Sequence, residues 1–272
     1  MNTKTSLTKS KQEQEPKVLL HLSDKGVATV TLNMAEKHNA FDEHIIALLS
    51  QTFDQLKANK QVKLMVLAAR GKSFCAGADL AWMKKMATYS HQQNLDDATR
   101  LAHMLKTLNE LPIPTIAKVQ GAAFGGAVGL VSCCDIAIAS DKAKFSLSEV
   151  KLGLIPATIS PYVIRAIGEK ACRRYFLTAE PFDAKQALKL GLINELVSHH
   201  ELDQTVEHFG QMMLANSPHA LAQAKRLIFE VANQPINSTL IDQTSQRIAD
   251  IRVSKQGQEG LTAFLEKRRP NW

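Results

Sequence analysis

Apolar residues alternate with polar ones near the start of the chain and then recur at helical spacing, and this change of period predicts the first elements. The sequence KVLLHLSDKGVATVTLN (residues 17–33) indicates two short strands around a turn at residues 23–26, which is typical of a hairpin. The stretch VKLMVLAA indicates a buried strand. Between them, FDEHIIALLSQTFDQLKAN predicts a helix, because its apolar residues recur at helical spacing at Ile45, Leu48, Leu49, Phe53 and Leu56.

The alternation of strand and helix continues along the middle of the chain. IPTIAKVQG indicates a strand, GGAVGLVSC a helix and DIAIAS a strand, followed by AKFSLSEV and a helix around residues 161–166. Such alternation favours an α/β core with parallel pairings and right-handed crossovers. From about Glu201 the periodicity is helical. We therefore predict a flexible polar tail over residues 1–16, an α/β core over 17–200 and a helical C-terminal region over 201–272 that serves oligomerisation or forms a lid.

Composition places the chain among ordinary globular proteins. Of its 272 residues, 45% are hydrophobic and 22% are charged, and no apolar run approaches the roughly 18–20 residues of a membrane span. The N-terminal residues lack the apolar segment of a signal peptide, so we expect a cytoplasmic protein without a membrane partner. Four cysteines without a CxxC pair favour reduced thiols.

The charge of the chain leaves its ligand open. Lys and Arg exceed Asp and Glu by 33 to 26, a formal net charge of +7, which suits an anionic ligand or nucleic acid, although on charge alone a generic solvated surface is the better explanation. The sequence contains no HExxH, no Cys/His cluster with zinc spacing and no GxSxG. RNA binding stays as an alternative from another class, which the absence of an aromatic-rich RNA motif and an aromatic content of 6% disfavour.

Two turns rich in small residues are the candidates for chemistry. Gly71-Lys72-Ser73 mimics the end of a phosphate-binding loop, but Val66 stands where that motif needs glycine. What remains is a turn at residues 76–78 followed by Asp79, a good N-cap for a helix. GAAFGGAVG likewise lacks GxGxxG order and sends a helix out from Gly125-Gly126. Both turns are explained by packing alone, and both could also present free backbone N–H groups to one oxyanion.

Five segments occur in an order and spacing that resembles the enoyl-CoA hydratase/isomerase (crotonase) family. The resemblance runs from about Lys17 to Trp272 and is strongest to bacterial members that hydrate 3-methylglutaconyl-CoA in leucine and isovalerate breakdown. The segments are SFCAGADLAWM, IAKVQGAAFGGAVGLVSCCDIAIAS, AKFSLSEVKLGLIPATISPYVIRAIG, RRYFLTAEPFDAKQALKLGLINELV and GLTAFLEKRRPNW.

The resemblance implies a crotonase-like spiral of ββα repeats with a helical C-terminal trimerisation region, assembled as a homotrimer or a dimer of trimers. It implies an acyl-CoA thioester as substrate, with coenzyme A part of that substrate and no separate cofactor or metal. By matching positions, the N–H groups of Ala78 and Gly126 form the oxyanion hole and Glu149 transfers the proton. The residues that match coenzyme A contacts are Lys37, Ala40, Ala76, Asp79 and Leu80, with Phe264 and Lys267 supplied by a neighbouring subunit.

One departure from the family pattern affects the expected reaction. Many family hydratases carry a second glutamate three residues after the oxyanion-hole glycine, and this chain has Gly129 there, with the twenty-residue separation to Glu149 preserved. A single carboxylate suffices to move a proton between two carbons. We therefore expect an enoyl-CoA hydratase acting on a short branched substrate, with a Δ3,Δ2-enoyl-CoA isomerase as the alternative. Lys84 and Lys85 are candidates to bind a distal carboxylate, although a solvated helix face explains them as well.

Overall fold

A computed structural model describes residues 15–272 of the chain, so the prediction of a flexible tail lies almost entirely outside the described residues. The elements up to the second turn are β1 (Val18–Leu22), β2 (Val27–Leu32), η1 (Ala35–Lys37), α1 (Glu43–Ala58), β3 (Leu64–Ala69), α2 (Leu80–Met86), α3 (His91–Asn109), β4 (Thr115–Val119) and β5 (Ala123–Phe124). They are followed by α4 (Gly126–Cys133), β6 (Ile136–Ser140), β7 (Lys144–Ser146), η2 (Glu149–Leu152), α5 (Ser160–Thr178), β8 (Phe182–Asp183), α6 (Ala184–Leu190), β9 (Glu195–Val197), α7 (Leu202–Leu214), α8 (Pro218–Val231), α9 (Ser238–Val253) and α10 (Lys255–Leu265).

The main sheet has six strands in the order β1-β2-β3-β4-β6-β9. β1 and β2 pair antiparallel as the predicted hairpin, and the remaining neighbours pair parallel. The hairpin turns at Gly26, whose φ of +82° is open to glycine without strain. The parallel strands lie between helices, which explains why β3 reads as an uninterrupted apolar run in the sequence.

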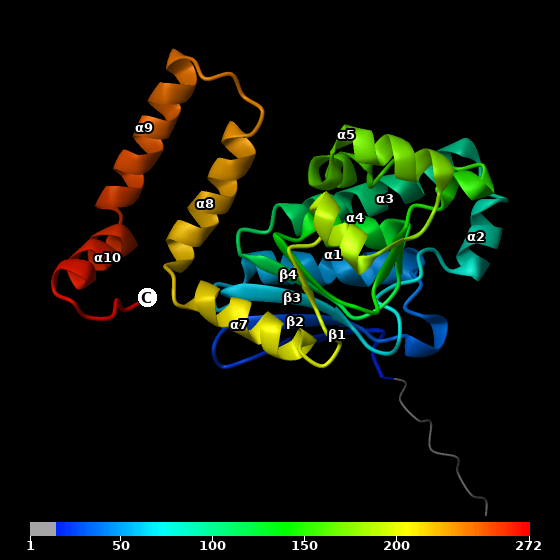
Figure 1. The fold of residues 1–272 in the computed structure, drawn as a ribbon, viewed down its shortest axis with the longest axis horizontal. Coiled ribbons are helices and arrows are strands. Elements are labelled where there is room, and N and C mark those ends of the chain that lie inside the picture. Colours follow the sequence, from blue (N-terminus) through cyan, green and yellow to red (C-terminus); the bar gives the residue numbers. More distant parts are fainter. Residues whose placement is uncertain (1–14) are drawn as a thin grey trace, which may run out of the picture.

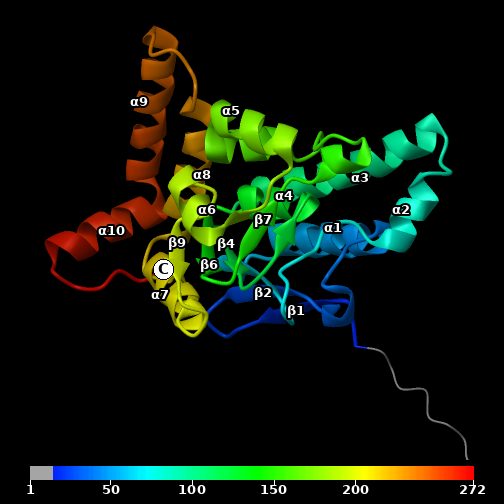
Figure 2. The ribbon, with the colours of Figure 1, turned by 45° about the vertical axis from the view of Figure 1, so that its right-hand side comes forward.

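Helices cover both faces of this sheet (Figure 1). Alternate residues of β3 point to opposite faces of the main sheet. Met65 and Leu67 belong to the large core that includes α1, α3 and α4, whereas Leu64 and Val66 pack against side chains of α7. The first helix after residue 200 therefore covers the sheet, and α8, α9 and α10 extend away from it (Figures 1 and 2).

A second, three-stranded sheet holds the loops of interest. Its order is β5-β7-β8, and it is extended by two isolated bridges, Cys75 to Ala123 and Phe41 to Ala78. The segment at residues 75–79 thus lies between the segment at 38–41 and β5. The two turns singled out in the sequence are neighbours because of this small sheet.

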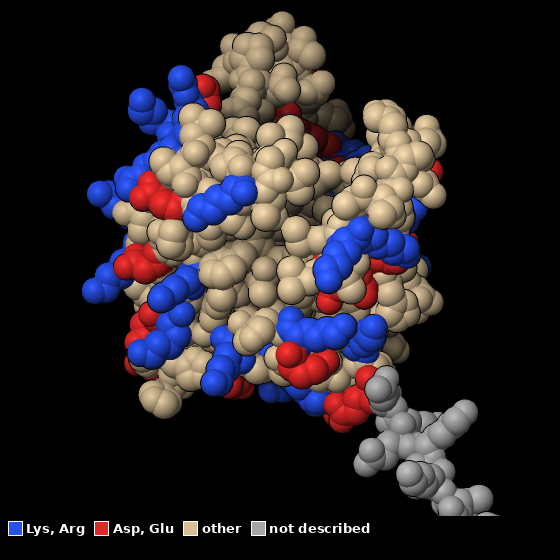
Figure 3. Space-filling view, turned by 90° about the vertical axis from the view of Figure 1, so that its right-hand side faces the viewer, with Lys and Arg blue, Asp and Glu red and all other residues tan. Residues whose placement is uncertain are grey.

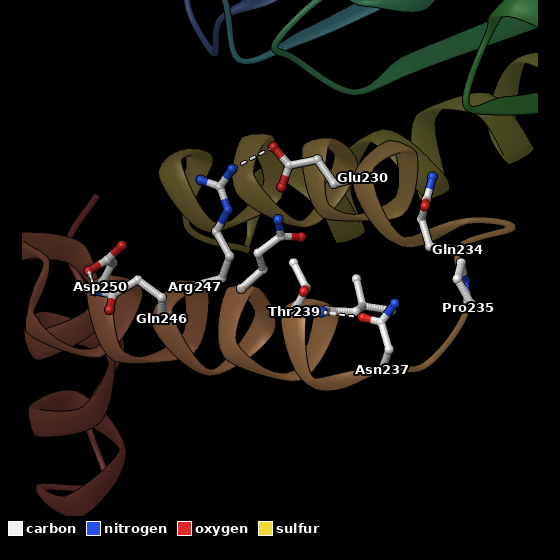
Figure 4. A pocket seen from close by; sticks show the side chains of 10 residues that line it. Glu230, Gln234, Pro235, Asn237, Thr239, Gln246, Arg247 and Asp250 are labelled. Atoms are coloured by element: carbon white, nitrogen blue, oxygen red, sulfur yellow. Dashed lines mark hydrogen bonds and ion pairs between the residues drawn. The ribbon is translucent and has the colours of Figure 1, made fainter.

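A partly buried ion pair attaches α8 to the core. Lys225 Nζ lies 2.8 Å from Asp135 Oδ2 and donates to Ile113 O at 3.2 Å, and the same carboxylate oxygen accepts from Thr115 N–H. Beyond this anchor, a polar cleft of about 770 Å³ separates α8 from α9, with an ion pair between Glu230 and Arg247 across it (Figure 4).

Within residues 15–272, no helix has the length and apolar character to cross a bilayer.

Candidate active site

The Ala78 N–H group is unpaired although its neighbours on both sides are hydrogen bonded. Phe41 N–H donates to Gly77 O at 2.9 Å, and Asp79 N–H donates to Phe41 O at 3.0 Å. The ladder therefore fixes the peptide planes around Ala78, and no acceptor within the described residues takes its N–H. A fixed, half-buried amide without a partner is what an oxyanion hole requires.

The second amide lies at the start of α4. Gly125 N–H donates to Ser146 O at 2.8 Å, while Gly126 N–H, the first in the helix, finds no acceptor among residues 15–272. Gly125 has a φ of +55°, and a Cβ there would lie 3.2 Å from Glu149 Oε1. A Cβ on Gly126 would lie 2.6 Å from the Phe41 ring. Both glycines are needed, because side chains would close the space between the helix start and its neighbours.

Glu149 lies beside this helix start. Seen as sequence alone it would be an exposed strand end, but it begins η2 and is half-buried. Its Oε2 is buried without a hydrogen-bond partner in the described part of the chain. Burial raises the pKa of the Glu149 carboxyl above its ordinary value, against a smaller lowering by a hydrogen bond with its own backbone. A carboxyl with a raised pKa next to unpaired amides is suited to proton transfer.

Gly129 faces an isoleucine. A Cβ at this position would lie 2.4 Å from Ile159 Cγ2 and 2.9 Å from Ile159 Cβ, with Leu105 Cδ2 at 3.6 Å. Ile159 is 2% exposed and begins the turn into α5. The place that a second carboxylate would need is therefore filled by an apolar side chain from another part of the chain.

Two of the residues that match coenzyme A contacts form an ion pair. Lys37 Nζ in η1 lies 3.6 Å from Asp79 Oδ2, and the lysine side chain is exposed. Asp79 caps α2, since its Oδ1 accepts from Ala81 N–H at 2.8 Å and from Trp82 N–H at 3.1 Å. The Trp82 hydrogen bond, helped by Ala81 and Lys37, lowers the pKa of Asp79. Asp79 thus orients the turn, and Lys37 is the cation left near the surface.

The remaining matched residues of the first half lie around the same turn. Ala76 N–H donates to His38 O at 3.0 Å, and Ala40 N–H donates to Lys37 O at 3.0 Å. Leu80 is 76% exposed at the start of α2. On the α2 side of the molecule, Lys and Arg side chains lie around a central region without charge (Figure 3).

Phe264 and Lys267 are not brought to this turn within one chain. They lie at the end of α10, on the opposite side of the molecule from α2 (Figures 1 and 2). Phe264 is 81% exposed. Of the two lysines considered for a distal carboxylate, Lys85 is held by Glu43 and lies over the Tyr89 ring.

Four buried side chains near the two turns are not among the functional residues that the sequence predicts. Asn39 and Gln120 donate to backbone carbonyl oxygens that follow β3, Ile159 fills the space beside Gly129, and the Trp82 indole N–H is buried without an acceptor in residues 15–272. Neither amide carries a signal in the sequence: Asn39 follows Lys37 and His38, and the distant carbonyl partners that a buried amide needs appear only in the fold.

The fold and this geometry define the class of protein: an α/β chain in which an unpaired amide at a helix start lies beside a half-buried carboxyl. A sequence profile of the enoyl-CoA hydratase/isomerase family matches residues 23–272. The chain belongs to the enoyl-CoA hydratase/isomerase family, and its fold is crotonase-like, as the resemblance implied.

Individual relatives agree with this assignment. A crystal structure of an enoyl-CoA hydratase from Shewanella pealeana ATCC 700345 is 50% identical, covers 95% of this chain and 97% of its own, and superposes with a TM-score of 0.92. The human mitochondrial methylglutaconyl-CoA hydratase is 30% identical over 272 residues, covering 96% of this chain and 78% of its own. The short-chain-enoyl-CoA hydratase of Clostridium acetobutylicum is 29% identical, covering 89% and 92%.

Proposed function

We propose that this enzyme adds water to a short branched 2-enoyl-CoA, 3-methylglutaconyl-CoA, in leucine and isovalerate breakdown. The observation that carries the proposal is the Glu149 carboxyl beside Gly125, at the start of a helix whose first amide is unpaired. The thioester oxygen accepts from the N–H groups of Ala78 and Gly126. Negative charge that builds on this oxygen as water adds is stabilised by both donors, and losing one such donor costs about 10²–10³ in rate.

Glu149 moves the proton in this mechanism. Its ionised form takes a proton from the attacking water as the oxygen bonds to the β-carbon, and the electron pair of the double bond moves to the thioester enolate. The carboxyl then gives that proton to the α-carbon, so that Glu149 returns to its starting form. A positioned base or acid of this kind contributes about 10²–10⁴ in rate.

One observation favours the branched substrate: a relative of the chain, the human methylglutaconyl-CoA hydratase, is named for this acyl group. For the distal carboxylate, Lys84 is the candidate, since Lys85 is engaged with Glu43. No cofactor is needed besides the coenzyme A carried by the substrate.

A steady-state hydration assay tests the proposal. We expect a higher kcat/KM with methylglutaconyl-CoA than with crotonyl-CoA, and equal values would contradict the proposed specificity. Glu149→Gln keeps the shape of the side chain and cannot take the proton, so we expect it to lose about 10²–10⁴ of the rate. If Glu149→Gln keeps full activity, Glu149 has no catalytic role.

A Δ3,Δ2-enoyl-CoA isomerase is the second candidate, and the Ile159 side chain beside Gly129 is the observation that favours it. An isomerase needs no water over the β-carbon, and one carboxyl can carry a proton from the α-carbon to the γ-carbon. Supplying 3-enoyl and 2-enoyl thioesters separately decides between the two. A hydratase consumes the 2-enoyl compound in water, whereas an isomerase interconverts the pair.

We further propose a cytoplasmic homotrimer or a dimer of trimers. Large apolar side chains are exposed along the helices that extend from the core: Ile228, Ile241, Ile248, Val253, Leu261, Phe264 and Leu265. Exposed apolar surface of this extent is typical of an interface. A neighbouring copy covering these helices would also bring its Phe264 and Lys267 toward the coenzyme A turn, from which they are remote within one chain.

A further inference from the structure

A fully buried amide joins the turn that displays Lys37 to the loop that leads into Ala78. Asn39 Oδ1 accepts from Met34 N–H at 2.8 Å. Its Nδ2 donates to Arg70 O at 2.8 Å and to Ser73 O at 2.9 Å. Asn39 is 0% exposed, so these bonds exchange little with water, and one side chain ties three backbone positions together.

The backbone of the same turn continues this connection to Ala78. His38 O accepts from Ala76 N–H, and Phe41 bonds to the residues before and after Ala78, at distances of 2.9 to 3.0 Å. His38 and Asn39 both have left-handed backbones, with φ of +51° and +54°. Two consecutive non-glycine residues in this region are strained and persist only where the surroundings enforce them. The Asn39 amide supplies most of that enforcement, beside a contact of 3.2 Å between His38 Nδ1 and Ser73 Oγ and a backbone hydrogen bond from Asn39 N–H to Met34 O.

We propose that Asn39 is a positioning residue that transmits binding of the coenzyme A moiety to the Ala78 amide. The inference rests on the proposed function, because it requires an acyl-CoA substrate that contacts the turn at residues 37–40. Contacts to the coenzyme A hold this turn in one conformation. The Asn39 hydrogen bonds then hold the backbone at Arg70 and Ser73 in place, and the hydrogen bonds of Phe41 on either side of Ala78 fix the direction of the Ala78 N–H group. Binding energy from the remote part of the substrate is then expressed in kcat.

Gln120 provides a matched control. Its Nε2 also donates to Ser73 O, at 3.0 Å, and to Ala69 O and Gly71 O at 3.0 and 3.1 Å. Gln120 follows β4 and makes no hydrogen bond to the turn at residues 34–41. It orders the loop before Ala78 without joining that loop to the coenzyme A turn.

The experiment compares one enoyl group carried on coenzyme A with the same group carried on pantetheine, which lacks the nucleotide. For the wild type we expect a larger kcat on the CoA thioester. Asn39→Gly keeps the left-handed backbone accessible and removes the amide, so kcat on the CoA thioester should fall toward the pantetheine value, by up to about 10²-fold. The ratio of the two kcat values should approach one. If Asn39→Gly fails to fold, Asn39→Asp replaces it: burial at this 0% exposed position keeps the carboxyl protonated, so it can donate to only one of the two carbonyl oxygens, and the ratio should move part of the way toward one.

Gln120→Met should lower kcat on both thioesters by one common factor and keep the wild-type ratio. The inference is supported if Gln120→Met keeps the wild-type ratio of the two kcat values while the Asn39 variant brings that ratio close to one. A variant that only makes the loop before Ala78 more mobile lowers kcat on both substrates alike. An Asn39 variant that keeps the wild-type ratio overturns it, as does a change in KM alone. A wild type inactive on every enoyl thioester would instead refute the proposed function, and that outcome is seen before any variant is measured.

Discussion

Replacing Gly129 by alanine should destabilise the protein by an amount that depends on Ile159. The added methyl group would lie 2.4 Å from Ile159 Cγ2, and both residues are buried. Overpacking of this kind costs about 1–3 kcal/mol. Alanine within a helix is favoured over glycine by about 0.5–1 kcal/mol. The free energy of unfolding should therefore fall by about 0–2.5 kcal/mol, centred near about 1 kcal/mol.

The sign of this effect should reverse once Ile159 is removed. Ile159→Gly deletes both atoms that crowd position 129, and glycine is tolerated at the N-cap of a helix such as α5. By itself this change should cost at least about 2–5 kcal/mol, because it leaves a cavity. In that background the nearest remaining neighbour is Leu105 Cδ2 at 3.6 Å, an ordinary contact. Gly129→Ala should then stabilise the protein by about 0.5–1 kcal/mol.

Guanidinium unfolding followed by far-UV circular dichroism measures all four proteins of this cycle. The protein concentration must be the same throughout, because the stability of an oligomer depends on it. Gly210→Ala in α7 is the control: its Cβ would lie 3.2 Å from Leu64 Cδ2 in β3, remote from Ile159, so its effect should be the same in both backgrounds. If Gly129→Ala has the same effect with and without Ile159, then Ile159 does not fill the space beside Gly129.

Two further predictions concern pH and assembly. Because burial raises the pKa of Glu149, kcat/KM should decline on the acidic side at a pH above 4.5, as the base becomes protonated. The stability that protonated Glu149 contributes to the folded state is present below pH 4.5 and is lost as the pH rises through the folded pKa. The difference in the free energy of unfolding between wild type and Glu149→Gln should therefore change over that pH range. A constant difference would contradict the raised pKa of Glu149. Sedimentation equilibrium should show trimers or hexamers that Ile241→Asp shifts to smaller species, and a monomeric wild type would contradict the proposed assembly.

The periodic parts of the chain could be predicted from sequence. The hairpin, the buried strand β3, the strands β4 and β6 and the helix α4 are all confirmed, because each buries one or two faces and therefore repeats apolar residues at a fixed interval. The helix expected around residues 161–166 extends to Thr178 across a kink at Gly168, where φ is +79°. The two-residue strands β5 and β8 are too short to show a period, so the small sheet that holds both turns was not foreseen.

Hydrogen bonds between distant segments leave no comparable pattern. Asn39 bonds to carbonyl oxygens 31 and 34 residues further along the chain, and Gln120 to carbonyl oxygens 51, 49 and 47 residues before it. Each of these side chains looks like an ordinary polar residue until the fold brings its partners close. The burial of Glu149 is of the same kind, since it depends on the helix start at Gly125 and not on neighbours in the sequence.

The Gly129 position shows how this limits a functional prediction. The sequence shows only that position 129 carries glycine and no carboxylate. It leaves open whether water or another polar group occupies the space that a glutamate side chain would take. In the structure, Ile159, thirty residues further along the chain, occupies it. Burial raises the pKa of Glu149, and position 129 holds no second carboxylate that would raise it further by repulsion. In the proposed mechanism, Glu149 holds the water that adds to the substrate without a second carboxylate at position 129, so the choice between hydration and isomerisation depends on how the acyl group is placed against this one carboxyl.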